Sequence, residues 1–88
     1  MYRLSDQVRS TRTGDGGIVL DIQQGRMLQV NSVGAEILEL LKQETSVAEI
    51  AGSIARIYSI SEESAQADVQ EFLQALETHH LLCVPKNE

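Results

Sequence analysis

The chain has 88 residues, enough for one small domain that buries about 60–65% of its unfolded surface. Thirteen acidic residues against seven basic ones give a net charge of −6, which repels phosphate backbones and disfavours nucleic acid as a partner. The single cysteine, the absence of a signal-like start and the lack of an apolar run near the roughly 20 residues of a membrane span predict a soluble, cytoplasmic protein without membrane contact.

The first third of the sequence predicts a three-stranded antiparallel meander. Residues 8–13 are rich in β-branched and hydroxyl side chains and predict the first strand. The glycine-rich stretch 14–17 predicts a flexible hairpin turn, because several of its residues could adopt positive φ at low cost. Residues 18–22 and 27–30 predict the other two strands, because their apolar side chains recur with period 2. Gly25 lies in the loop between them, where a short hairpin needs a left-handed residue.

The two better-defined strands each have a core side. In a meander, the middle strand is paired on both sides, whereas the first and third each keep one open edge. Unpaired backbone groups on such an edge are a liability or a docking site. The alternating sets are Ile18, Leu20 and Ile22 against Val19 and Asp21, and Leu28 and Val30 against Met27 and Gln29.

Helical spacing replaces the strand pattern after the third strand. A helix is predicted over residues 32–43, with either Asn31 or Ser32 as its cap. Ser46 and Glu49 form a capping box, because the serine oxygen can accept from the backbone of Glu49 while the glutamate carboxylate accepts from the serine amide. This pair predicts the start of a second helix.

The third helix is predicted to begin at Ser61 and to end at the histidine pair 79–80. Two carboxylates follow Ser61 and stabilise the positive end of the helix dipole. Residues 83–84 predict a short extended segment, whereas residues 1–7 show no period and are expected to enter the fold loosely. The apolar stripe of the third helix is Val69, Phe72, Leu73 and Leu76.

Strands followed by helices without alternation predict an α+β fold, with a three-stranded antiparallel sheet packed on three helices. The second and third helices, joined by residues 59–60, have the size of a helix-turn-helix. A sheet beside that pair gives a winged-helix-like shape. Such a shape is compatible with peptide binding and with DNA binding.

The residues and the order of the elements together resemble the PqqD-like family, whose domain recognises ribosomally made, post-translationally modified peptides. The third strand ends in Val30-Asn31, where the family often has Leu-Asn, and Met27 and Leu28 stand where aromatic residues are common. The matching segments span about residues 16–82 and are Val19-Leu20-Asp21, Gly25-Arg26, VNSVGA at 30–35, ILELL at 37–41, SVAEI at 46–50, ARIY at 55–58, DVQEFL at 68–73 and Leu81-Leu82.

The resemblance implies one peptide-recognition domain over residues 1–88, with a core of about 8–84, that acts as a non-catalytic adaptor. Family members bind the leader of a precursor peptide as an extra strand and present it to a separate enzyme. The chain looks most like the stand-alone lasso-peptide protein, which serves a leader peptidase; the quinone-cofactor version works with a radical SAM enzyme. The implied binding residues are Met27, Leu28, Gln29, Val30 and Asn31 on the third strand, and Asp68, Val69, Glu71, Phe72 and Ala75 on the third helix.

Plainer interpretations of these residues stay open. The third strand could be an ordinary sheet edge, and Val69 and Phe72 fit a core better than a groove, with Phe72 able to serve both. Asp68 and Glu71 are either part of a solvated face or attract lysine or arginine of a leader. Asp21 either meets a basic leader residue or, as we favour, bonds the backbone of the following turn.

Other functions are less well supported by the sequence. No phosphate-binding glycine loop, nucleophile elbow or His-Glu-x-x-His helix occurs, so we expect no catalytic residues and no cofactor. His79, His80 and Cys83 make a poor metal site, since adjacent helical side chains point about 100° apart and no fourth ligand is evident. A winged-helix DNA-binding module, a structural subunit of a larger enzyme and a strand-exchanged homodimer remain alternatives, although the third helix carries no arginine or lysine.

Overall fold

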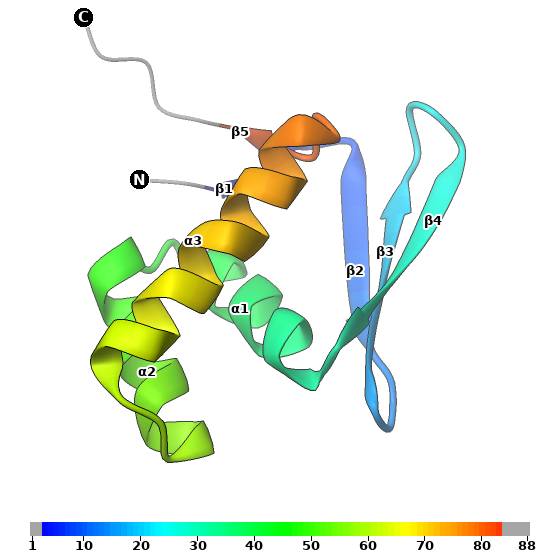
Figure 1. Cartoon of the computed structure of the whole chain (residues 1–88). Helices are drawn as coiled ribbons and strands as arrows, with labels where there is room; N and C mark the ends of the chain where they lie inside the picture. Colours follow the sequence, from blue (N-terminus) through cyan, green and yellow to red (C-terminus); the bar gives the residue numbers. More distant parts are fainter. Residues whose placement is uncertain (1–2, 84–88) are drawn as a thin grey trace, which may run out of the picture.

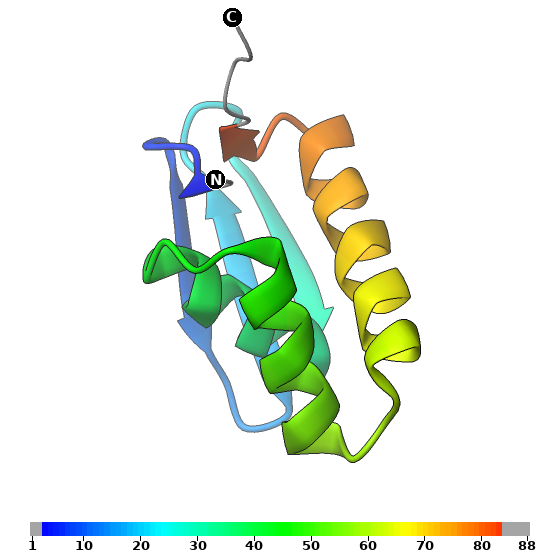
Figure 2. The same cartoon turned by 90° about the vertical axis from the view of Figure 1, so that its left-hand side faces the viewer.

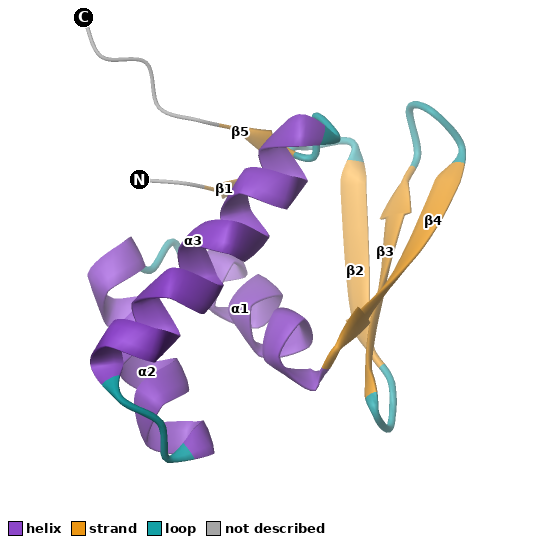
Figure 3. Ribbon diagram, viewed as in Figure 1, coloured by secondary structure: helices purple, strands orange, loops and turns teal. Residues whose placement is uncertain are grey.

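The computed structural model describes residues 3–83. It confirms the α+β prediction, because β2, β3 and β4 form a three-stranded antiparallel sheet in that order and three helices follow it. All three helices lie on one side of this sheet (Figures 1, 2 and 3). The elements are β1 (Arg3–Leu4), β2 (Val8–Arg12), β3 (Gly16–Asp21), β4 (Arg26–Asn31), α1 (Ser32–Lys42), α2 (Val47–Tyr58), α3 (Glu62–Thr78) and β5 (Leu82–Cys83).

The two hairpins use glycine differently. Gly25 has φ +67°, as predicted for the β3–β4 turn, and it is the one glycine with positive φ among residues 3–83. The predicted hairpin turn lies between β2 and β3, but it is shorter than residues 14–17 and uses no positive φ. Gly16 and Gly17 belong to β3, where the neighbouring backbone comes too close for a side chain: a Cβ on Gly16 would run into the carbonyl oxygen of Val30.

The core side of β3 is its less apolar side. Val19 and Asp21 are buried, whereas Leu20 and Ile22 are 42% and 49% exposed. Small residues are needed under α1, because a Cβ on Gly17 would lie 3.2 Å from the Ala35 side chain. The larger side chains of β3 consequently face away from the helices.

The helices meet the sheet through α1 and close the core with α2 and α3. The fully buried large side chains come from all three helices, from β3 and from the residue before β5. Burial of these groups is the main stabilising contribution to such a small domain. They are Ile37, Leu38, Leu41, Ile50, Ile54, Leu81, Val19 and Val69.

The helix caps follow the sequence prediction. Asn31, and not Ser32, caps α1, and its side-chain oxygen accepts from the Gly34 N–H at 2.8 Å. Ser46 and Glu49 form the predicted capping box, and the Ser61 hydroxyl accepts from the backbone at the start of α3. These contacts satisfy backbone donors that a helix leaves unpaired at its start.

The two ends of the described chain pair with each other, which the sequence did not indicate. Residues 1–7 were expected to be loose, but Arg3–Leu4 pairs antiparallel with Leu82–Cys83, and Ser5 donates to the Leu81 carbonyl at 3.0 Å. Leu81 and Leu82 are buried and anchor this short sheet. Val84, included in the predicted extended segment and domain core, lies outside the described residues.

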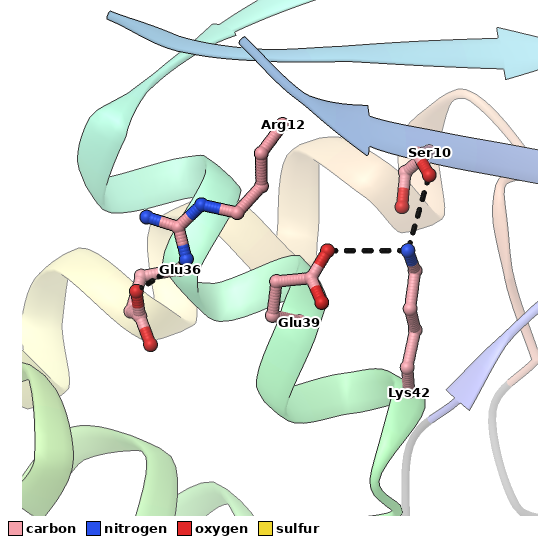
Figure 4. Close-up of polar contacts among 5 residues, drawn as sticks. All are labelled: Ser10, Arg12, Glu36, Glu39 and Lys42. Carbon is pink, nitrogen blue, oxygen red and sulfur yellow. Dashed lines mark hydrogen bonds and ion pairs between the residues drawn. The ribbon is translucent and has the colours of Figure 1, made fainter. Parts of the chain in front are cut away.

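Polar contacts fasten β2 to α1 (Figure 4). Arg12 Nη1 lies 2.7 Å from Glu36 Oε1, and Lys42 Nζ donates to Ser10 O at 3.0 Å and to Glu39 Oε2 at 3.2 Å. The hydrogen bond and the charge of Glu36 raise the pKa of Arg12. Within residues 3–83, none of the helices combines the length and apolar character that crossing a membrane requires.

Candidate peptide-binding site

The hydrogen bonds on one side of β3 determine which backbone groups it offers to the other. Thr13 donates to the Gly16 carbonyl and Ile22 donates to the Gln7 carbonyl, both at 2.9 Å. In an antiparallel ladder without bulges, hydrogen-bonded pairs alternate with pairs that do not bond. The even-numbered residues of β3 therefore bond β2, and its odd-numbered residues bond β4.

This alternation gives β4 an open row of backbone groups. By register, the residues of β4 that bond β3 are Arg26, Leu28 and Val30. The N–H and C=O groups of Met27 and Gln29, together with the Asn31 N–H, face away from β3. In the part of the chain that the structure describes, no hydrogen bond reaches the outward groups of Met27 or Gln29.

The opposite edge of the sheet, on β2, is partly occupied by the chain itself. Val8 donates its N–H to the Ser5 carbonyl at 3.1 Å, and its own carbonyl accepts from Arg9 Nη1 at 3.2 Å. The outward Ser10 carbonyl accepts from Lys42 Nζ at 3.0 Å. Of the two edges of the three-stranded sheet, β2 is thus occupied at Val8 and Ser10, whereas β4 keeps the backbone groups of Met27 and Gln29 free to accept an added strand.

A groove lies at the Asn31 end of this open edge. Asp68, Glu71, Phe72 and Ala75 share one face of α3 at helical spacing, and this face points toward the groove. The hollow there has a volume of about 350 Å³. Its walls come from α1, α3 and the end of β4, and are Asn31, Val33, Gly34, Ile37, Asp68, Glu71, Phe72 and Ala75.

Phe72 forms the apolar wall of the groove. Its ring packs so closely on the start of α1 that a Cβ on Gly34 would lie 2.8 Å from Phe72 Cε1 and 3.1 Å from Val30 Cβ. Phe72 is half-buried, so it contributes to the core and to the groove surface at once. Val69 is fully buried and supports the groove from beneath, so it offers no surface to a docked peptide.

The charged residues of the groove lie at its mouth. Asp68 and Glu71 are exposed, and neither has an ion-pair partner among residues 3–83. Two carboxylates beside an apolar wall create a local negative potential that favours a cation. The arrangement suits an extended peptide that brings an apolar side chain and a basic one.

Arg26 links β4 to α3 at the other end of the strand. Its Nη2 lies 3.3 Å from the His79 carbonyl at the end of α3 and 3.5 Å from Asp21 Oδ2. Arg26 therefore holds the start of β4 close to the end of α3, at the opposite end of β4 from the groove.

The predicted site residues divide by the direction in which they point. Met27 and Gln29 present free backbone groups, whereas the side chains of Leu28 and Val30 are half-buried on the helix side and their backbone bonds β3. The Asn31 side chain is occupied as the cap of α1. Direction could not be assigned from the sequence, because it depends on the register of β3.

Residues outside the predicted set also build the site. Val33, Gly34 and Ile37 of α1 line the groove, and Arg26 connects the start of β4 to the end of α3. The close approach of Phe72 requires a glycine at position 34, so the Val33-Gly34-Ala35 stretch held a signal that was not assigned to the groove.

Asp21 and the histidines have structural surroundings. Asp21 Oδ1 accepts from the Gln24 N–H at 3.2 Å, which confirms the favoured turn role. Across residues 3–83, no three His, Cys, Asp or Glu side chains gather to hold a metal ion.

Comparison with known proteins assigns the fold to a family. A family model described as "Coenzyme PQQ synthesis protein D (PqqD)" matches residues 16–82. The chain belongs to the PqqD family. The match runs from β3 to β5, so the PqqD segment contains β4, the groove and all three helices. It confirms the resemblance that the sequence motifs indicated.

Solved structures of PqqD-like domains match nearly the whole chain. "TbiB1 in Complex with the TbiA(beta) Leader Peptide" is 29% identical, with a TM-score of 0.87 over 97% of this chain and 99% of that one. "Lasso peptide synthetase B1 complexed with the leader peptide" is 23% identical, with a TM-score of 0.83 over 94% and 98%. The PqqD part of Methylobacterium extorquens PqqCD, a stand-alone recognition element, is 20% identical, with a TM-score of 0.79 over 94% and 88%. No curated protein matches the chain.

Proposed function

We propose that this chain is a non-catalytic adaptor that binds the leader region of a ribosomally synthesised precursor peptide. The observation that carries this proposal is the row of unbonded backbone groups on Met27 and Gln29 beside an apolar groove. The relative TbiB1, 29% identical, was solved in complex with a leader peptide, which supports the same use of this fold.

Binding occurs by strand addition along β4. The outward groups of Met27, Gln29 and Asn31 exchange hydrogen bonds with the peptide backbone, and these bonds supply affinity without reading the sequence. Each bond contributes about 0.5–1.5 kcal/mol, so they need the support of side-chain contacts.

Side chains on α3 supply the sequence preference. Phe72 and Ala75 receive an apolar peptide side chain, and Asp68 and Glu71 attract a lysine or arginine at the groove mouth. Leu28, Val30 and Val69 act from the core by holding β4 and α3 in place.

The bound peptide is then handed to a separate enzyme. We favour the leader peptidase of a lasso-peptide pathway as that partner, and a radical SAM enzyme of quinone-cofactor biosynthesis is the alternative. The whole chain acts as one recognition domain, and we place it in the cytoplasm, where precursor peptides are made. A DNA-binding role is disfavoured, because α3 carries acidic residues and no lysine or arginine.

A titration tests this proposal directly. The probe is the fluorescently labelled leader of the precursor peptide encoded beside this gene, with a scrambled version of the same composition as the control. Fluorescence anisotropy at two salt concentrations should give submicromolar binding of the leader alone, and most of that binding should survive moderate salt. Equal binding of both peptides, or no binding by folded protein, would contradict the proposal and favour a structural subunit.

A further inference from the structure

The face of the sheet turned away from the helices carries an exposed row that ends at the open edge. Leu20 of β3 is the register partner of Met27 of β4, and the two side chains are 42% and 67% exposed. Arg9 of β2 is the partner of Leu20 on its other side. The helices lie across the opposite face (Figures 1 and 3). The row Arg9–Leu20–Met27 therefore leads directly to the place where a further strand would add.

A strand added along β4 must divide its side chains between the two faces of the sheet. Peptide residues beside Leu28 and Val30 point toward α3 and the groove, because those two side chains are on the helix side. Peptide residues beside Met27 and Gln29 point to the outer face. Directly opposite side chains in neighbouring strands lie about 4.5–5.5 Å apart at their Cβ atoms, so one peptide side chain comes into contact with Met27.

We propose that Met27 is a specificity-determining residue, and that its occupant is an apolar side chain on the outward side of the bound peptide. The inference rests on the proposed function and deepens it. The domain then recognises apolar residues on both faces of one strand, one against Phe72 and one against Met27. Because successive side chains alternate, these two peptide residues are separated by an odd number of positions.

The next outward row of side chains shows why the apolar contact is confined to Met27. Gln29 is the register partner of Ile18, which in turn pairs with Thr11, so the second outward row has polar residues at both ends. The exposed large apolar side chains around Met27 are Leu20 and Ile22 alone among residues 3–83. Three such residues fall short of the roughly 800 Å² per partner that a standard protein interface buries, so a single side chain fits this patch better than a second copy.

Double-mutant cycles on the leader and the protein test the proposal. The leader encoded beside this gene is changed to serine at one position after another, and each peptide is titrated against wild type, Met27→Gln and Phe72→Leu. Ala75→Leu is a second groove variant in case Phe72→Leu lowers stability. Ile57→Gln is the matched control, because Ile57 is a comparably exposed apolar residue, 53%, on α2 away from the sheet.

The expected result is that Met27→Gln lowers the affinity for the wild-type leader about fivefold, while Ile57→Gln leaves it unchanged. Serine at one leader position should no longer lower the affinity when the protein carries Met27→Gln, and serine at a second position should no longer lower it in the groove variants. The two leader positions should be an odd number of residues apart. An unchanged affinity of Met27→Gln for a leader that wild type binds would overturn the inference and leave the adaptor role standing. So would an even separation, or an effect of Met27→Gln on self-association alone. A leader that fails to bind wild type overturns the proposed function itself.

Discussion

The ring of Phe72 occupies the space that a side chain on Gly34 would need. A Cβ at position 34 would lie 2.8 Å from Phe72 Cε1 and 3.2 Å from Cζ. This contact joins the start of α1 to the middle of α3 and shapes the wall of the groove beside β4. A methyl group added at position 34 would therefore affect both the stability of the domain and the shape of the groove.

Gly34→Ala should displace Phe72 and weaken both properties. Overpacking of this kind costs about 1–3 kcal/mol, and the displaced ring narrows the groove, so leader affinity should fall as well. Denaturant unfolding and the anisotropy titration measure the two effects. Gly52→Ala is the control, because nothing lies within 4 Å of a Cβ there; it should stabilise the protein by about 0.5–1 kcal/mol and leave binding unchanged. If the Gly34→Ala protein binds the leader as tightly as wild type, Phe72 does not contribute to the binding site.

Gln29→Pro should abolish an outward donor without breaking the sheet. Proline is tolerated on an edge strand where its missing N–H would face solvent, and the backbone of Gln29 faces the open edge. We expect the unfolding midpoint to change little and leader affinity to fall about tenfold. Gln29→Ala keeps the N–H and should bind nearly as wild type. Equal binding by both variants would show that the peptide does not add at β4.

Reversing one charge at the groove mouth should weaken binding of a basic leader. Asp68→Lys replaces an attraction with a repulsion, and we expect about a threefold to tenfold loss at low salt that shrinks as salt is added. Glu77→Lys makes the same change in net charge on another face of α3, near Gln70 and Gln74, and should have little effect. An equal loss in both variants would assign the effect to net charge.

Removing Arg26 should loosen the link between β4 and the end of α3. Arg26→Met loses the hydrogen bond to the His79 carbonyl and the ion pair with the buried Asp21 carboxylate, at a cost of about 1–2 kcal/mol in the free energy of unfolding. Arg12→Met, which removes the exposed pair with Glu36, should cost less. Leader affinity should fall for the Arg26 variant alone, and a loss of stability without a loss of affinity would count against the role of Arg26 in the site.

Local signals in the sequence were sufficient for the order of the main elements and for the starts of the helices. Helix caps at Ser46 and Ser61 use contacts within one turn, and Gly25 satisfies a backbone requirement of its own hairpin. The family motifs added an expected use of the third strand as a docking edge, and the match to residues 16–82 confirms the family.

Long-range contacts account for what the sequence left undetermined. The strand pair Arg3–Leu4 with Leu82–Cys83 joins two-residue segments from opposite ends of the chain, which carry no period of their own. Asp21 lies on the buried side of β3 because Arg26 and the turn backbone bind its carboxylate there. The rule that apolar residues point inward therefore could not tell which side of β3 faces the core. Which backbone groups of β4 face the open edge depends on the register of both hairpins, β2–β3 and β3–β4.

The alternation of outward and inward backbone groups along β4 can be measured residue by residue. In amide hydrogen exchange followed by NMR, Leu28 and Val30 should be protected in the free protein, because they bond β3, whereas Met27 and Gln29 should exchange rapidly. Saturating leader peptide should slow exchange at Met27 and Gln29 by at least about tenfold. Slowed exchange confined to β2, or unchanged rates at Met27 and Gln29 with the leader bound, would contradict strand addition at β4.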